Sequence, residues 1–189
     1  LTENIIEDLN EKMVFLGGPR QVGKTTAAKE LVARNIKSSY YNWDRISDRT
    51  AALRGEWVPD YKLIILDEFH KHSKWKTWIK GEFDTHKDIY QFLLTGSARL
   101  NIFRRGGDSL QGRYHYYTLH PFSIAELMNS KTAVKPMQEL VFNESSHDEE
   151  FNALFDFGGF PEPFLKQNRR FLRRWHMEKT ERFFSEDIR

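Results

Sequence analysis

The sequence has no cysteine among its 189 residues, so disulfides and thiolate metal sites are excluded. No apolar run approaches the length of a membrane span and no signal peptide is visible, so we expect a cytoplasmic protein with no membrane partner. An excess of one charge is also missing. The 29 Lys and Arg residues nearly balance the 27 Asp and Glu residues, and a net charge of +2 does not by itself indicate nucleic-acid binding.

A glycine loop stands between an apolar run and a helix-forming segment. Residues 18–25 read Gly-Pro-Arg-Gln-Val-Gly-Lys-Thr, which has the form G-x-x-x-x-G-K-T. Gly18 and Gly23 let the backbone curl so that successive N–H groups face one anion, and the following helix adds its positive N-terminal end. In such a loop Lys24 reaches the β- and γ-phosphates and the Thr25 hydroxyl binds Mg²⁺. The predicted nucleotide contacts come from Gly18, Pro19, Arg20, Gln21, Val22, Gly23, Lys24, Thr25 and Thr26.

Two carboxylates end a second apolar run, at Leu63-Ile64-Ile65-Leu66-Asp67-Glu68. Asp67 is predicted to hold Mg²⁺ directly or through water. Glu68 is predicted to orient and deprotonate the attacking water. Neighbouring residues at a strand end point to opposite sides, so the two acids can take different roles.

Three further polar positions are candidates for the same site. Thr95 and Ser97 follow the apolar run Phe92-Leu93-Leu94, and either could bond the γ-phosphate or the attacking water, although Ser97 could equally cap a helix. Arg113 follows Gly112 directly before a strand, where its guanidinium could reach a nucleotide, including one on a neighbouring subunit, or could equally pair with an acid at the surface. Arg104 and Arg105 are weaker candidates for that role. His70 and His72 lack further ligands at suitable spacing, so we expect no zinc site.

Strands alternate with helices along the first two thirds of the chain, which predicts an α/β fold with a five-stranded parallel sheet. The helices are expected at 24–35, 46–53 with Asp44 as its N-cap, 75–83 and 99–103, and the strands at 12–16, 38–43, 63–66, 89–94 and 114–119. We expect a nucleotide-binding core at 1–128, a polar loop or insertion at 129–150, and the start of a helical lid at 151–189, with helices at 151–157 and 161–188. The chain begins without Met and stops inside a helical pattern, so we expect a fragment of a longer protein.

The C-terminal third contains two further features. Residues 158–163 read Gly-Gly-Phe-Pro-Glu-Pro, a rigid turn that could pack on a base or ribose or could simply start a helix. Pro161 is our candidate for the nucleotide contact. Arg169, Arg170, Arg173 and Arg174 form one basic stripe on a predicted helix, which suits phosphate or nucleic acid, or a solvated face.

Six motifs together resemble a known family. They are 18–26, Leu-Asp-Glu-Phe-His-Lys at 66–71, Leu-Thr-Gly-Ser-Ala-Arg-Leu at 94–100, Leu-Gln-Gly-Arg at 110–113, Leu-His-Pro-Phe-Ser-Ile-Ala-Glu-Leu at 119–127 and Gly-Gly-Phe-Pro-Glu-Pro-Phe at 158–164. In this order they resemble the prokaryotic AAA-type ATPases that usually carry a C-terminal domain of unknown function, which are related to the archaeal and signal-transduction ATPase clades.

The resemblance implies a role for each motif. Lys24 and Thr25 are the Walker A residues, and Asp67 with Glu68 form the Walker B pair. Residues 95–97 are the sensor-one region, where many AAA proteins have Asn and this sequence reads Thr-Gly-Ser. Arg113 is similar in position to the arginine finger, and the Gly-Phe-Pro at 159–161 resembles the lid motif that approaches adenine.

These observations predict a Mg²⁺-dependent ATPase that binds ATP or ADP and couples its nucleotide state to the lid, to neighbouring subunits in a homo-oligomer, or to a missing C-terminal domain. Preference for ATP over GTP follows from the resemblance alone. Glu68 directly after Asp67, with the sensor-like strand, argues against a rival reading as a P-loop kinase. The second rival is a slow, nucleotide-gated regulatory or DNA-associated switch, for which the basic stripe is the main support.

Overall fold

A computed structural model describes residues 1–33, 37–96, 110–128, 147–182 and 184 of the chain. It has two compact units, residues 1–119 and 120–189. The helix expected at 99–103, Ser97, and the pair Arg104 and Arg105 lie outside the described residues. Within the described part, no helix is both long enough and apolar enough to cross a lipid bilayer.

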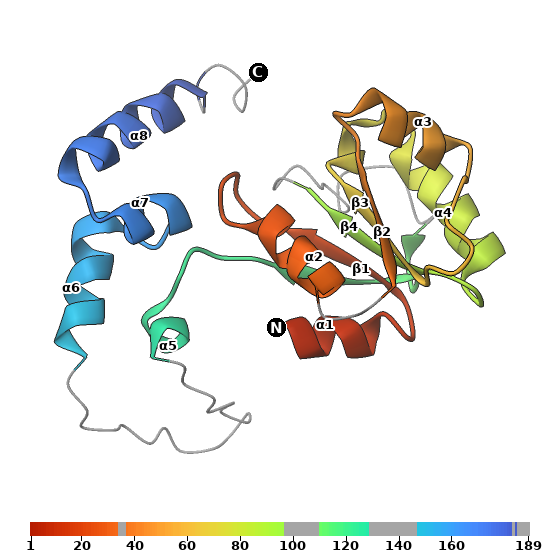
Figure 1. The fold of residues 1–189 in the computed structure, drawn as a ribbon, viewed down its shortest axis with the longest axis horizontal. Helices are drawn as coiled ribbons and strands as arrows, with labels where there is room; N and C mark the ends of the chain where they lie inside the picture. The colour runs from red at the N-terminus through yellow and green to blue at the C-terminus, as the bar shows by residue number, and fades with distance from the viewer. Residues whose placement is uncertain (34–36, 97–109, 129–146, 183, 185–189) are drawn as a thin grey trace. The chain divides into compact units, whose positions relative to one another are not determined.

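The first unit is built on a five-stranded sheet in which every strand pairing is parallel (Figure 1). The order is β2-β3-β4-β1-β5, and the strands are β1 (Met13–Gly17), β2 (Ser38–Asn42), β3 (Leu63–Asp67), β4 (Gln91–Thr95) and β5 (Tyr114–Thr118). The predicted fold class, an α/β fold with five parallel strands flanked by helices, is confirmed. Because the strands are parallel, their carboxyl ends lie at the same end of the sheet, and β4 lies between β1 and β3. The segments after these three strands therefore meet at that end.

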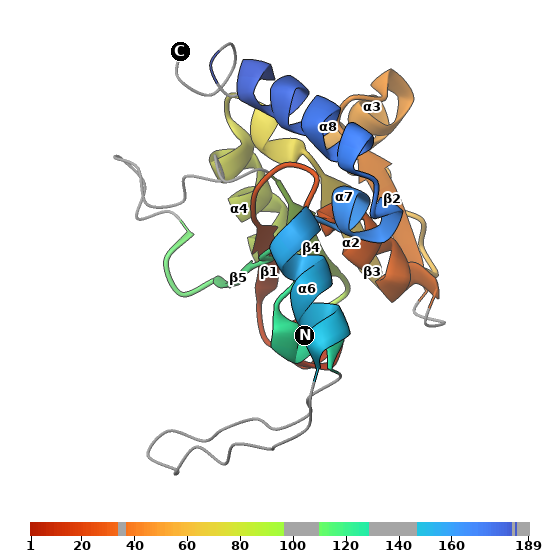
Figure 2. The ribbon, with the colours of Figure 1, turned by 90° about the vertical axis from the view of Figure 1, so that its left-hand side faces the viewer.

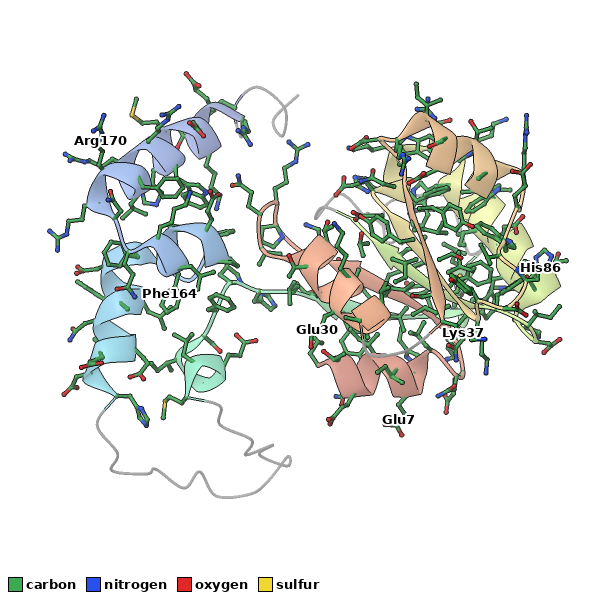
Figure 3. The ribbon with its side chains drawn as sticks, in the orientation of Figure 1. Glu7, Glu30, Lys37, His86, Phe164 and Arg170 are labelled. Carbon is green, nitrogen blue, oxygen red and sulfur yellow. The ribbon has the colours of Figure 1, made fainter. Side chains whose placement is uncertain are left out.

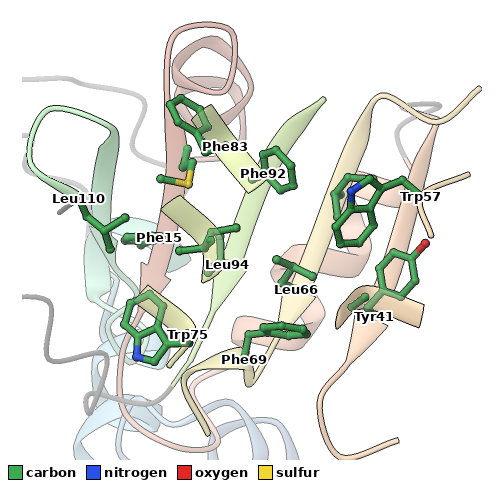
Figure 4. Packing of buried hydrophobic residues seen from close by; sticks show 14 residues of the cluster. Phe15, Tyr41, Trp57, Leu66, Phe69, Trp75, Phe83, Phe92, Leu94 and Leu110 are labelled. Carbon is green, nitrogen blue, oxygen red and sulfur yellow. The ribbon is translucent and has the colours of Figure 1, made fainter. Parts of the chain in front are cut away.

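Helices cover both faces of this sheet, which is why β1 and β3 are buried at every residue. On one face, α3 (Ile46–Leu53) and α4 (Trp75–His86) pack on a core rich in aromatic side chains (Figure 4). On the other face, α1 (Thr2–Asp8) and α2 (Lys24–Ala33) pack on aliphatic side chains. Successive residues along β3 alternate between the faces: Leu66 joins the aromatic core, whereas Ile65 faces α2.

The described part of the second unit contains the helices α5 (Ile124–Leu127), α6 (Asp148–Phe157), α7 (Pro161–Lys166) and α8 (Arg169–Arg182), of which Figure 2 labels the last three. Helix α7 contacts both α6 and α8. Residues 120–128, which we had grouped with the core, belong to this unit. The Phe122 N–H donates to the Gly159 carbonyl at 2.7 Å, and the rings of Phe122 and Phe164 meet edge to face at 5.6 Å.

Two local expectations were wrong. A continuous helix was expected at 161–188, but α7 ends at Lys166, the next residue Gln167 has a left-handed φ of 43°, and α8 starts separately at Arg169. Asp44 was expected to cap α3, but the N-cap residue is Arg45 and the cap has no side-chain hydrogen bond. The Asp44 carboxylate binds Lys71 instead. A long-range ion pair has taken the place of the local cap that the sequence pattern favoured.

The core packing yields a first prediction. We expect Leu66→Ala to lower the free energy of unfolding by about 2–5 kcal/mol, because it leaves a cavity at a fully buried site between the sheet and α4. The matched control is Leu53→Ala, which removes the same atoms where the side chain is 41% exposed and should cost about 1 kcal/mol or less. Urea unfolding followed by tryptophan fluorescence measures both. Equal costs would contradict this description of the core.

Candidate nucleotide-binding site

The loop between β1 and α2 has the backbone that its glycines predict. Gly18 and Gly23 have φ of 146° and 99°, and Gln21 between them has φ of 65°. A Cβ on Gly18 would lie 2.4 Å from the Leu119 carbonyl oxygen, so this position also requires glycine for steric reasons. Helix α2 begins at Lys24 and opens its N-terminus onto the loop. Exposed backbone N–H groups at such an end bind anions.

Lys24 is buried, with 6% of its surface exposed, and is held inside the loop. Its Nζ donates to the carbonyl oxygens of Gly18 at 3.1 Å and Pro19 at 2.8 Å. Burial lowers the pKa of Lys24, and the nearby carboxylates of Glu68 and Asp67 oppose that shift. The loop thus presents a partly desolvated cation, which suits an anionic phosphate.

Asp67, at the end of β3, contacts Thr25, which follows the glycine loop. Its carboxylate is 2% exposed, and its Oδ2 accepts a hydrogen bond from Thr25 Oγ1 at 3.0 Å, across 42 residues of sequence. Tyr40 Oη also donates to Oδ2, and Thr95 Oγ1 donates to Oδ1. The adjacent hydroxyl and carboxylate form an all-oxygen donor set. That set fits Mg²⁺, which proteins hold with one or two oxygen ligands while phosphates and water complete the shell.

Tyr40 is a site residue that the sequence analysis missed. Burial raises the pKa of Tyr40, and the hydrogen bond to Asp67 adds to the shift, so the phenol stays a donor. No local sequence signal identifies it, because the contact depends on how β2 pairs with β3. Asn42 is the register partner of Asp67, and Tyr40 lies two residues earlier on the same face of β2. Its ring is long enough to reach forward to the end of β3.

Glu68 turns sharply out of β3. It has φ of 59° and ψ of 19°, a left-handed conformation that is uncommon for a residue with a side chain. Its N–H donates to the Thr95 carbonyl at 3.1 Å, which anchors the turn to β4. Backbone strain of this kind is concentrated at functional sites.

The Glu68 carboxylate lies beside a lysine and a histidine. The short 3₁₀ helix η1 (Phe69–Lys71) follows it and places Lys71 Nζ 3.6 Å and His70 Nε2 3.8 Å from Glu68 Oε2. Burial lowers the pKa of His70, and the Glu68 charge opposes that effect. The sequence analysis missed both neighbours. The i, i+3 spacing of Glu68 and Lys71 in a tight turn was the available signal.

Arg113 is not brought to the phosphate loop of its own chain. It directly precedes β5, whose first residue pairs with Met13 at the start of β1, whereas the loop follows Gly17 at the other end. The length of the strand separates them, about 16 Å at about 3.3 Å per residue. Arg113 Nε donates to Asp84 Oδ1 at 2.7 Å, and this bond is the main cause of the lowered pKa of Asp84. Any role on a nucleotide would therefore act on a second subunit.

The remaining predicted residues differ in their surroundings. Arg20, Gln21 and Thr26 are exposed, whereas the Val22 side chain is buried at 4% exposure, so Val22 offers its backbone. Pro161 is the first residue of α7 in the second unit, and its contact with adenine stays a prediction. Gly159, beside it, has a structural reason of its own: a Cβ there would lie 2.4 Å from the Phe122 carbonyl oxygen.

The strand order and the glycine loop at the end of β1 define the class of this protein: a P-loop NTPase domain with the AAA-type fold. The sequence model of the AAA domain family matches residues 10–128, and the chain belongs to that family. The family is prokaryotic, and its members often carry a C-terminal domain of unknown function. No curated protein matches the sequence.

Solved structures similar to this chain include three that we compare. Orc1 of Aeropyrum pernix in complex with DNA is 13% identical, with a TM-score of 0.45 over 68% of this chain and 46% of that one. The RuvB Holliday junction branch migration motor of Thermotoga maritima is 18% identical, with a TM-score of 0.43 over 68% and 49%. PCH-2 of C. elegans is 15% identical, with a TM-score of 0.44 over 84% and 52%. The chain thus spans about half the length of these proteins.

The Asp67 contacts yield a second prediction. Thr95→Val keeps the shape of a fully buried side chain but removes the hydroxyl that donates to Asp67. We expect it to lower the free energy of unfolding by about 1.5–3 kcal/mol, the cost of a lost hydrogen bond to a charged group. Urea unfolding measures this, with Thr118→Val at an exposed strand end as the matched control. A cost no larger than that of the control would show that this hydroxyl does not support Asp67.

Proposed function

We propose that this domain binds and hydrolyses ATP with Mg²⁺. The observation that carries the proposal is the 3.0 Å hydrogen bond between Thr25 and Asp67. It joins the residue that would hold the metal from the phosphate loop to the one that would hold it from β3. Membership in the AAA domain family supports the same activity.

Each site residue has a role in this proposal. The loop N–H groups and the buried Lys24 bind the β- and γ-phosphates, and Thr25 and Asp67 hold Mg²⁺, which when bound neutralises phosphate charge. Glu68 orients the attacking water and takes its proton. Thr95 supports Asp67 through its hydroxyl, so its effect on the γ-phosphate is indirect. Catalysis then rests on positioning and charge rather than on a covalent step.

Coupling to other parts of the protein completes the proposal. Arg113 acts on the nucleotide of a neighbouring copy, since it precedes the amino end of β5 whereas its own loop follows the carboxyl end of β1. The second unit responds to the nucleotide as a lid through Pro161. A homo-oligomer and a C-terminal partner domain are both consistent with this arrangement. The choice of ATP over GTP follows from the family.

The third prediction concerns turnover. The rate of phosphate release from Mg²⁺-ATP per chain should rise with protein concentration, because Arg113 is supplied by a second copy. Glu68→Gln should lower the rate at least about a hundredfold while ATP still binds, because general-base catalysis contributes about 10²–10⁴. Lys24→Ala should abolish binding itself. Calorimetry measures binding, and Glu3→Gln, at an exposed position of α1, is the matched control.

The same assay separates the rival functions. Tight ATP binding without turnover at any concentration would favour a slow nucleotide-gated switch. Turnover that appears only with an added small-molecule acceptor would favour a P-loop kinase. If the native chain does not bind ATP, the proposal fails.

A second function, nucleic-acid binding, has one specific observation in its favour. Helix α8 has six basic and two acidic residues, a net charge of +4, whereas the whole chain carries +2 and the remainder therefore carries −2. A groove of about 430 Å³ beside it is lined by Lys166, Asn168, Arg170, Phe171 and Arg174. Figure 3 shows the Arg170 side chain extending outward from the helix. Among the described residues, neither Arg170 nor Arg173 has an ion pair.

The fourth prediction tests this second function. Fluorescence anisotropy with a labelled single-stranded oligonucleotide should show binding that weakens steeply with salt, because phosphate contacts release counterions. Arg170→Glu should weaken binding about three- to tenfold at low salt and flatten the salt dependence by about one ion. Arg45→Glu, at an exposed arginine of the first unit, is the matched control. No binding at low salt, or equal losses in both variants, would remove this function.

A further inference from the structure

Lys71 stands between two carboxylates but is not shared equally. Its Nζ donates to both oxygens of Asp44, at 2.6 and 2.8 Å. The distance from Nζ to Glu68 Oε2 is 3.6 Å, which is too long for a hydrogen bond. Asp44 therefore takes the ammonium, and the Glu68 carboxylate is left without a lysine hydrogen bond.

Asp44 is held in place for this contact by the loop after β2. The Asp44 N–H donates to Asn42 Oδ1 at 2.8 Å, and the Trp43 N–H donates to the Asp67 carbonyl at 3.0 Å. The Trp43 ring stacks on His72 with 5.1 Å between ring centroids. The loop after β2 is thus fastened to the loop after β3 on both sides of Lys71. This explains why Asp44, next to the start of α3, does not cap that helix.

Removing Asp44 would change the surroundings of Glu68. A lysine side chain has rotatable bonds and would need to move by less than about 1 Å to reach hydrogen-bond distance of Oε2. A carboxylate bound by an ammonium has fewer free lone pairs and a fixed direction. It would be less able to accept a proton from a water placed for attack.

We propose that Asp44 is a positioning residue, which draws Lys71 away from Glu68 and leaves that carboxylate free to bind the attacking water. The inference rests on the proposed hydrolysis of ATP and goes beyond it by assigning a role to two residues outside the phosphate-binding motifs. Asp44 acts through Lys71, so its effect should depend on Lys71 being present.

The kinetic test measures kcat and KM for Mg²⁺-ATP in Asp44→Asn, Lys71→Met and the double variant. We expect Asp44→Asn to lower kcat about two- to fivefold with KM unchanged, which is the factor that an exposed ion pair typically supplies. Adding Lys71→Met should restore kcat to that of Lys71→Met alone. Asp60→Asn, an exposed aspartate of the same unit, is the matched control. If the double variant stays as slow as Asp44→Asn, Asp44 has a structural role and the proposal is wrong.

A second measurement does not depend on turnover. Urea unfolding gives the coupling between Lys71→Met and Glu68→Gln from a double-mutant cycle, once in the native background and once with Asp44→Asn. We expect the coupling to grow about two- to fivefold, as an equilibrium factor, when Asp44 is neutralised. Equal coupling in the two backgrounds would overturn the proposal even if the chain hydrolyses ATP. Growth of the coupling in a chain without turnover would support the competition for Lys71 and place the failure in the proposed hydrolysis.

Discussion

The buried carboxylate of Asp67 is the constraint on which the rest of the site depends. An ionised group at 2% exposure is tolerated when hydrogen bonds satisfy it, and here three hydroxyls do so. Those hydroxyls come from α2, β2 and β4, three elements that are separated in the sequence. The need to satisfy one charge thereby ties the phosphate loop, the edge strand and the central strand to a single point.

Parallel pairing is what allows these elements to meet. With β4 between β1 and β3, the ends of the three strands lie side by side, and each contributes one part of the site. The crowding has a local cost, because Glu68 must leave the strand in a left-handed conformation. Its N–H bond to the Thr95 carbonyl holds that turn. The two neighbouring acids therefore have different surroundings: Asp67 is buried among hydroxyls, and Glu68 lies beside Lys71.

Two lysines lie near Glu68, and neither donates a hydrogen bond to its carboxylate. Lys24 lies in the glycine loop and Lys71 in the turn after β3, and each donates to oxygen atoms other than those of Glu68: carbonyls of the loop for Lys24, and Asp44 for Lys71. A carboxylate meant to accept a proton benefits from nearby positive charge for orientation, but is hindered by a direct ammonium bond. The distances are consistent with that compromise. The exposed Asp44 then connects the Glu68 carboxylate, the proposed general base, to the surface of the domain.

The sequence by itself determined the parts of this protein that local pattern specifies. The glycine spacing, the Lys-Thr pair and the apolar runs predicted the loop, the parallel strands and the assignment of Thr25 and Asp67 to one metal site, because they reflect backbone conformation and burial. The AAA family followed from the order of the motifs. Only the tertiary structure decided what depends on contacts between distant residues. Tyr40 reaches Asp67 because of the register between β2 and β3. Arg113 lies at the amino ends of the strands, whereas the loop lies at their carboxyl ends. Asp44 binds Lys71 instead of capping its helix. In each case the partner is a residue distant in the sequence that only the folded chain brings within reach.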